Sequence, residues 1–137
     1  MVSVIAGEKG QGKTKKLITM ANDEVKVTDG NVVFINNDDR FIYDLHYDVR
    51  FVQTADFPLE NYKMFFGFIC GICSQNSDIQ KIYIDGITKI VPGISVGDIE
   101  ELAALLDAFS SAHHLDFIMT LSAKIPDLPE GISKYIA

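Results

Sequence analysis

The sequence lacks any apolar run long enough to cross a membrane. A transmembrane helix needs about 20 consecutive apolar residues, and no stretch of the 137-residue chain approaches that length. The first apolar run stops at Gly7, without the charged segment and longer apolar segment of a secretory signal. We therefore expect a cytoplasmic protein with no membrane partner.

Positive charge is also scarce. The chain has 12 Lys and Arg against 19 Asp and Glu, which gives a formal net charge of −7. Binding of nucleic acid through the overall field needs a basic footprint, so nucleic acid is not the expected partner, although a local basic patch would still permit it. The only dense basic cluster lies at residues 9–16, and a phosphate site accounts for it more simply.

Cysteine occurs only as Cys70 and Cys73, with C-x-x-C spacing. Such a pair can be a redox centre or half of a zinc site, but no second pair is present to complete the zinc site. The pair falls late in an apolar helical pattern, whereas a reactive thiolate is stabilised at a helix start. We interpret both cysteines as small core residues one helical turn apart.

Short apolar runs alternate with helical patterns along the chain, as is typical of parallel strands buried on both faces. Strands are predicted at 2–6, 32–35, 49–52, 80–85, 117–121 and 134–137, and helices at 12–22, 40–47, 59–73 and 98–113. Pro58 and the capping-box spacing of Asp98 and Glu101 predict two of the helix starts. This order predicts one α/β domain over residues 1–137, with a mostly parallel sheet of about five strands and helices on both faces.

A glycine-rich motif follows the first strand and fits the pattern G-x-x-x-x-G-K-S/T. The motif consists of Gly7, Glu8, Lys9, Gly10, Gln11, Gly12, Lys13 and Thr14. Gly7 and Gly12 allow backbone turns that a side chain would block, and Gly10 adds further freedom. The N–H groups of the loop then form an anion nest, at which the next helix directs its positive end. We expect Lys13 to reach the β- and γ-phosphates of a nucleotide and the Thr14 hydroxyl to ligate Mg²⁺.

Two acidic positions follow later strands. The strand at 80–85 ends in Asp85, and an apolar strand with a terminal Asp has the Walker B form, whose carboxylate holds Mg²⁺. The alternative is an ordinary Asp-Gly turn. Asp38 and Asp39 follow the second strand, where ligands bind in open α/β sheets, so they are candidate catalytic carboxylates. A solvated loop that caps the next helix fits them equally well.

On these motifs the chain resembles the P-loop NTPases, and the distance of the Asp85 strand from the first strand resembles their RecA-like (ASCE) branch. The resemblance covers nearly the whole chain, although only Gly7, Gly12, Lys13 and Thr14 are sharply diagnostic. It implies a three-layer P-loop NTPase fold, ATP and Mg²⁺ as cofactors, and catalytic roles for Lys13 and Asp85. It also implies nucleotide contacts from residues 7–14 and Lys15, and a strand between the two motif strands with a polar sensor at its tip, assigned to Ser122 or Thr120.

One departure from this branch concerns hydrolysis. Gly86 follows Asp85, where a catalytic Glu usually stands, and Arg40 and Arg50 are the only arginines, so no arginine finger is evident within the chain. Asp38 or Asp39 could replace the missing base. The resemblance therefore implies ATP binding with slow Mg-dependent hydrolysis, which a homo-oligomer or a protein partner would complete.

Two other functions remain open. The chain could be a non-hydrolysing ATP-dependent switch or assembly subunit, whose bound γ-phosphate orders nearby loops. Asp39-Arg40 also resembles an element of the short-chain thymidine kinases, but these enzymes have Asp-Glu at Walker B and a Cys-rich zinc lasso, which this chain lacks. The absence of a guanine-reading N-K-x-D element favours ATP over GTP.

Overall fold

The computed structural model describes residues 1–137 and is built on a five-stranded sheet. Its strands are β1 (Val2–Gly7), β2 (Asn31–Asn36), β3 (Arg50–Gln53), β4 (Ile79–Ile84) and β5 (Asp116–Ser122). The strand order is β1-β5-β4-β2-β3 and every pair is parallel. The α/β class and the parallel sheet are therefore confirmed.

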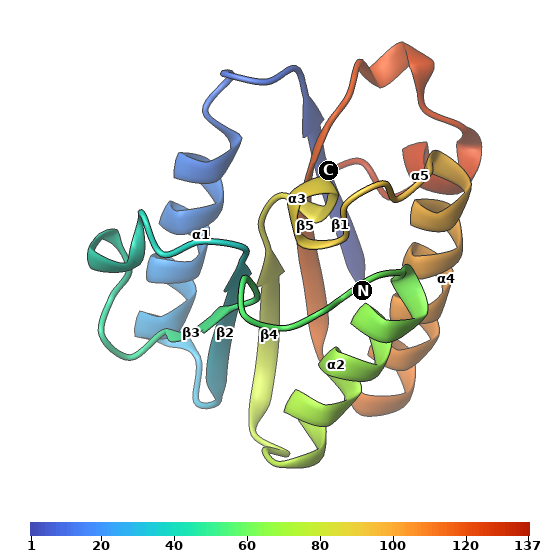
Figure 1. Ribbon diagram of the computed structural model, residues 1–137. Coiled ribbons are helices and arrows are strands. Elements are labelled where there is room, and N and C mark those ends of the chain that lie inside the picture. The colour runs from blue at the N-terminus through green and yellow to red at the C-terminus, as the bar shows by residue number, and fades with distance from the viewer.

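Helices cover both faces of this sheet (Figure 1). They are α1 (Lys13–Val27), α2 (Tyr62–Ser74), α3 (Ile87–Ile90), α4 (Val96–His113) and α5 (Glu130–Ser133). Helix α1 packs on one face, and α2 and α4 lie together on the other (Figure 1). No helix combines the length and the apolar character that a membrane span requires.

The alternation of side chains along β2 divides the core into two parts. Val32 and Phe34 pack with Leu17 of α1, whereas Val33 and Ile35 pack against the opposite layer with Phe65 of α2. Successive residues of a strand point to opposite faces, so a strand covered on both sides must be apolar throughout. This explains why the inner strands were evident in the sequence.

Strand β5 lies between β1 and β4, the two strands that carry the motifs. In the register of these strands, Ile5 is level with Thr120, and Ile84 is level with Met119. Because all the strands are parallel, the ends of β1, β5, β4 and β2 meet at one edge of the sheet. This edge carries the glycine-rich loop and Asp85.

Four predicted segments differ from the structure. The helix expected at 40–47 is reduced to a 3₁₀ turn, Ile42–Asp44. Asn22 of α1 explains the difference, because its side chain donates to the Asp44 carbonyl and accepts from the His46 N–H. The strand expected at 134–137 is a single bridge between Ile136 and Val4.

The other two differences concern the starts of α2 and α4. Helix α2 begins at Tyr62, and the Asn61 side chain caps it by accepting a hydrogen bond from the Met64 N–H. The predicted start at residue 59, directly after Pro58, is therefore wrong. Helix α4 begins at Val96, and Ser95 is its N-cap. The Ser95 hydroxyl accepts a hydrogen bond from the Asp98 N–H at 3.0 Å. The predicted cap at Asp98 is therefore wrong by three residues.

We expect Ser95→Ala to lower the free energy of unfolding by about 1 kcal/mol, because the substitution removes the cap of α4. Glu101→Ala is the control, since Glu101 is exposed and such a change should stay within about 0.5 kcal/mol. Urea unfolding measures both variants. A larger loss in Glu101→Ala than in Ser95→Ala would favour the capping box over the Ser95 cap.

Candidate functional site

The loop between β1 and α1 depends on two glycines in the left-handed region. Gly10 has φ of 87° and Gly12 has φ of 78°, values that residues with a side chain rarely adopt. Gly7 does not turn, contrary to expectation; it ends β1 and is paired with Ser122. A Cβ atom at Gly7 would lie 2.6 Å from Oε1 of Gln11, so Gly7 instead makes room for that side chain.

Two side chains close this loop on itself. Oε1 of Gln11 accepts a hydrogen bond from the Glu8 N–H at 3.0 Å. Nζ of Lys13 donates to the Glu8 carbonyl oxygen at 2.9 Å. The Lys13 ammonium therefore lies across the loop, with a backbone carbonyl as its partner and no carboxylate within salt-bridge distance. A bound anion would meet an available cation at this point.

Three polar side chains form a row across the end of the sheet: Asn36 at the end of β2, Asp85 after β4 and Thr120 within β5. Each stands two residues beyond Phe34, Tyr83 or Ile118, which belong to the core on the α1 side of the sheet. Residues two apart share a face, so the row also faces α1. The start of α1 brings Thr14 to the same place.

Asp85 is the centre of this row and is only 6% exposed. Its Oδ2 accepts from Asn36 Nδ2 at 2.9 Å and from Thr14 Oγ1 at 3.0 Å. Its Oδ1 accepts from Thr120 Oγ1 at 2.8 Å. All of these donors are neutral, and no cationic side chain forms a salt bridge with the carboxylate. Because a buried charge is costly unless it is paired, this arrangement suits a cation.

Thr120 connects the carboxylate to the start of α3. Its hydroxyl oxygen accepts the Gly86 N–H at 2.9 Å and donates its own proton to Asp85. Gly86 is the N-cap residue of α3. One hydroxyl thus fixes both the orientation of the carboxylate and the position of the helix that follows it.

A cavity of about 380 Å³ opens between the glycine-rich loop and this row. Its charged lining residues are five cations and one carboxylate: Lys9, Lys13, Lys15, Arg40, Lys89 and Asp85. Gly10, Gly12, Thr14, Asn36, Thr120 and Ser122 also line it. The protein as a whole has a net charge of −7, so this cavity differs from the rest of the molecule in its excess of positive charge. Such an excess suits a polyanionic ligand.

The structure brings most of the candidate residues to this cavity, but not all of them. Gly7, Glu8 and Gln11 line a separate hollow of about 400 Å³ on the other flank of the loop, with residues 123–126. Neither Asp38 nor Asp39 lines the cavity beside Asp85. Of the two sensor candidates, Thr120 contacts Asp85 directly, whereas Ser122 lines the cavity without a side-chain hydrogen bond.

Asp38 is instead paired with Arg40. Its Oδ2 lies 3.1 Å from Nε of Arg40, and its Oδ1 accepts the Arg40 N–H at 3.1 Å. Burial raises the pKa of Asp38, but hydrogen bonds and charge from Arg40, with a contribution from the charge of Lys89, outweigh it and lower the pKa overall. A carboxylate that binds protons this weakly is poorly suited to act as a general base near neutral pH.

Sequence reasoning missed Lys89, and it included Asn36 only as the first residue of the polar segment that holds Asp38 and Asp39. Asn36 is the polar residue that ends the apolar run of β2, next to Asp85 in the sheet, and a polar residue at that point was the available signal. Lys89 follows the Asp-Gly step by three residues, and no motif identifies it. It lines the cavity because α3 begins directly after Gly86, next to Asp85.

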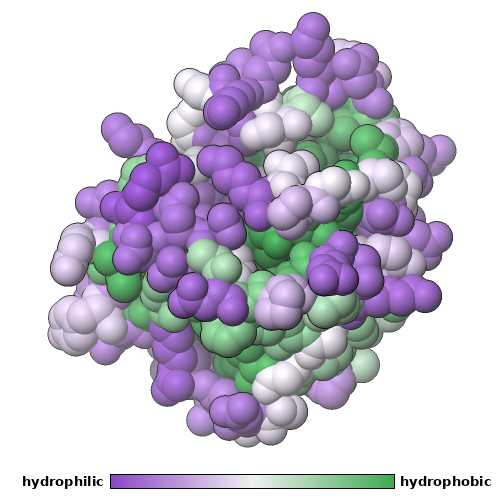
Figure 2. Space-filling view, viewed as in Figure 1, coloured by the Kyte–Doolittle hydropathy of each residue, from purple (hydrophilic) through white to green (hydrophobic).

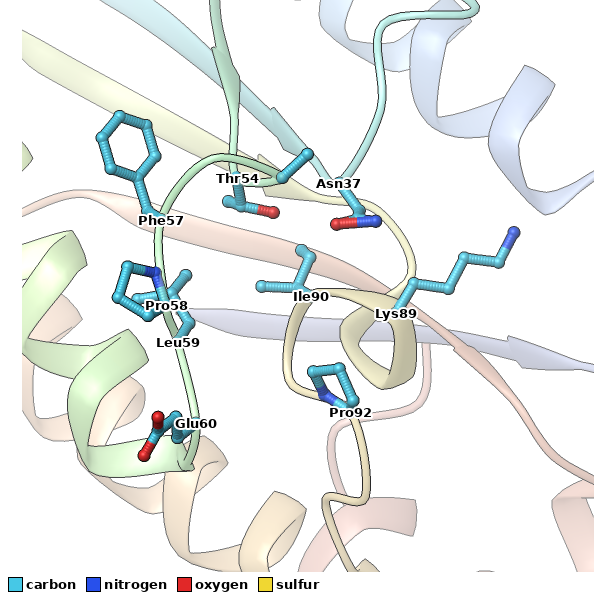
Figure 3. Close-up of a pocket in the computed structure, with 10 residues that line it drawn as sticks. Asn37, Thr54, Phe57, Pro58, Leu59, Glu60, Lys89, Ile90 and Pro92 are labelled. Carbon is cyan, nitrogen blue, oxygen red and sulfur yellow. The ribbon is translucent and has the colours of Figure 1, made fainter.

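A neighbouring cavity of about 370 Å³ lies between residues 54–60 and α3. Figure 3 shows Phe57, Pro58 and Leu59 along one side of it and Ile90 and Pro92 on the other. Lys89 also lines this cavity, so the two cavities share that residue. Figure 2 shows a hollow with apolar surface in the middle of this view of the molecule.

Both cysteines lie within α2 and form no disulfide. Burial raises the pKa of Cys70 and of Cys73, which keeps them as neutral thiols near neutral pH. Cys73 packs against the main core. Their environment is therefore the opposite of the one that activates a cysteine.

No family model matches this chain, and no curated protein sequence matches it.

We expect Thr120→Val to lower the free energy of unfolding by about 1–3 kcal/mol, because it leaves the Gly86 N–H without a partner and removes the closest donor to Asp85 Oδ1, which keeps only the longer bond from Thr14. Thr88→Val is the matched control, since Thr88 is exposed on α3. Urea unfolding of the two variants gives the comparison. Equal stability would mean that the Thr120 hydroxyl does not hold this network together.

Proposed function

We propose that the protein binds ATP with Mg²⁺ at the cavity beside Asp85, as a P-loop NTPase of the RecA-like branch. The observation that carries the proposal is the contact between Thr14 Oγ1 and Asp85 Oδ2 at 3.0 Å. It joins the end of the glycine-rich loop to the end of β4 across 71 residues of sequence. Both residues were named as Mg²⁺ ligands from the sequence.

The chain provides donors for the phosphates and for the ion. The loop N–H groups, the start of α1 and Lys13 would bind the phosphates. Thr14 would ligate the ion directly and Asp85 through water. No group of three or more His, Cys, Asp and Glu residues is placed to hold a metal, which fits Mg²⁺, since this ion usually takes its remaining ligands from phosphate and water.

When bound, Mg²⁺ would supply neutralisation of the charge on the β- and γ-phosphates. The protein's own part is to keep the carboxylate in position. Asn36 and Thr120 donate to different oxygens of Asp85, so the side chain cannot rotate without losing a buried hydrogen bond. The site is thereby oriented before any ligand arrives.

Hydrolysis is expected to be slow without a partner. Gly86 stands beside Asp85 where a carboxylate would orient the attacking water, and Asp38 is held by Arg40. The same observation favours the second candidate function, a switch that binds ATP without turning it over. Phosphate release from Mg-ATP by the purified protein separates the two: turnover above background supports the ATPase, and tight binding without turnover supports the switch.

We expect Lys13→Ala to weaken ATP binding by at least about tenfold, because it removes a charge-assisted hydrogen bond to phosphate. Lys16→Ala is the matched control, since Lys16 is exposed on the same helix and does not line the cavity. Isothermal titration calorimetry measures both affinities. Unchanged binding in Lys13→Ala would contradict the proposal.

We expect Asp85→Asn to remove most of the gain in ATP affinity that Mg²⁺ gives to the wild-type protein, because the neutral amide attracts the ion far less. Affinity in the presence of EDTA should change much less. Asp44→Asn, at an exposed position, should keep the Mg²⁺ effect. If Mg²⁺ strengthens binding equally in Asp85→Asn and the wild type, Asp85 does not hold the ion.

A further inference from the structure

Lys89 belongs to two cavities at once. It lies on α3, whose first residue follows the Asp85-Gly86 step directly. It lines both the cavity between residues 54–60 and α3 and the cavity beside Asp85. In Figure 3 its stem borders the first of these, and its ammonium group points away from Ile90 and Pro92.

The ammonium of Lys89 has no carboxylate partner within salt-bridge distance, and the side chain is exposed. Arg40 also lines the cavity, but its guanidinium already has a carboxylate partner. It is paired with Asp38 and lies over the ring of Phe41 at 5.4 Å. Lys89 is therefore the free cation that approaches the site from β4 and α3, opposite the loop that carries Lys13.

The position of α3 is set by the same network that orients Asp85. The Gly86 N–H donates to Thr120, and the Lys89 N–H donates to the Gly86 carbonyl at 2.9 Å. The base of the Lys89 side chain is thus tied to the carboxylate that would hold Mg²⁺. In the proposed function that ion would neutralise charge on the phosphates of the nucleotide.

We propose, resting on the proposed function, that Lys89 contacts the terminal phosphate of a bound nucleoside triphosphate and so makes the site prefer a triphosphate to a diphosphate. Lys13 reaches the phosphates from the loop, and Lys89 meets them from the Asp85 side. It supplies positive charge at the γ-phosphate from within the chain, whereas Arg40 is paired with Asp38 and Arg50 does not line the cavity. ADP, which lacks that phosphate, leaves Lys89 without a partner.

The test compares ATP and ADP affinities, in the presence of Mg²⁺, for the wild type, Lys89→Met and Lys89→Arg. Methionine keeps an unbranched apolar stem, so the wall of the neighbouring cavity is retained while the charge is lost. We expect Lys89→Met to lower the ratio of ATP to ADP affinity by about tenfold or more, as for loss of a charge-assisted hydrogen bond. Lys89→Arg should keep most of the ratio, and Lys63→Met on α2 should keep all of it.

Each outcome decides between the two proposals. If the wild type binds ATP and Lys89→Met keeps the wild-type ratio, the role of Lys89 is overturned and the ATP site stands. If Lys89→Met weakens ATP and ADP equally, the terminal-phosphate assignment is likewise overturned. If the wild type binds neither nucleotide, both proposals fail. A thermal melt of Lys89→Met that matches the wild type confirms that a lowered ratio comes from the lost contact.

Discussion

The carboxylate of Asp85 is the point on which the site depends. It is buried, and it accepts hydrogen bonds from α1 through Thr14, from β2 through Asn36 and from β5 through Thr120. Three parts of the chain that are distant in sequence are thereby held to one group. Because each donor is neutral, the contacts orient the carboxylate but leave its negative charge available for a cation, as a binding site for Mg²⁺ requires.

Much of the fold could be predicted because its signals are local. The inner strands are apolar throughout since both faces of the sheet are covered, and the loop before α1 follows a pattern with fixed spacing. The row formed by Asn36, Asp85 and Thr120 could not be predicted in the same way. It exists only because β4 lies between β2 and β5, and strand order is a long-range property that no local pattern encodes.

The errors have local or tertiary causes that can be named. Asn22 takes backbone groups of residues 44 and 46 that a helix would have used. Ser95 and Asp98 both have side chains able to cap a helix, and the earlier one caps α4. Lys89 enters the site only because α3 is placed by Thr120. In each case a side chain distant in sequence, or a competing neighbour, decided the result.

The glycine-rich loop follows β1, yet β1 pairs within the sheet only with β5, which is the last strand in sequence. Its other backbone contact is the bridge to Ile136. Strand β1 must therefore wait for residues 116–122 before it has a place in the sheet. Contacts of such long sequence separation slow folding, so the glycine-rich loop should take its final shape only after β5 has joined the sheet.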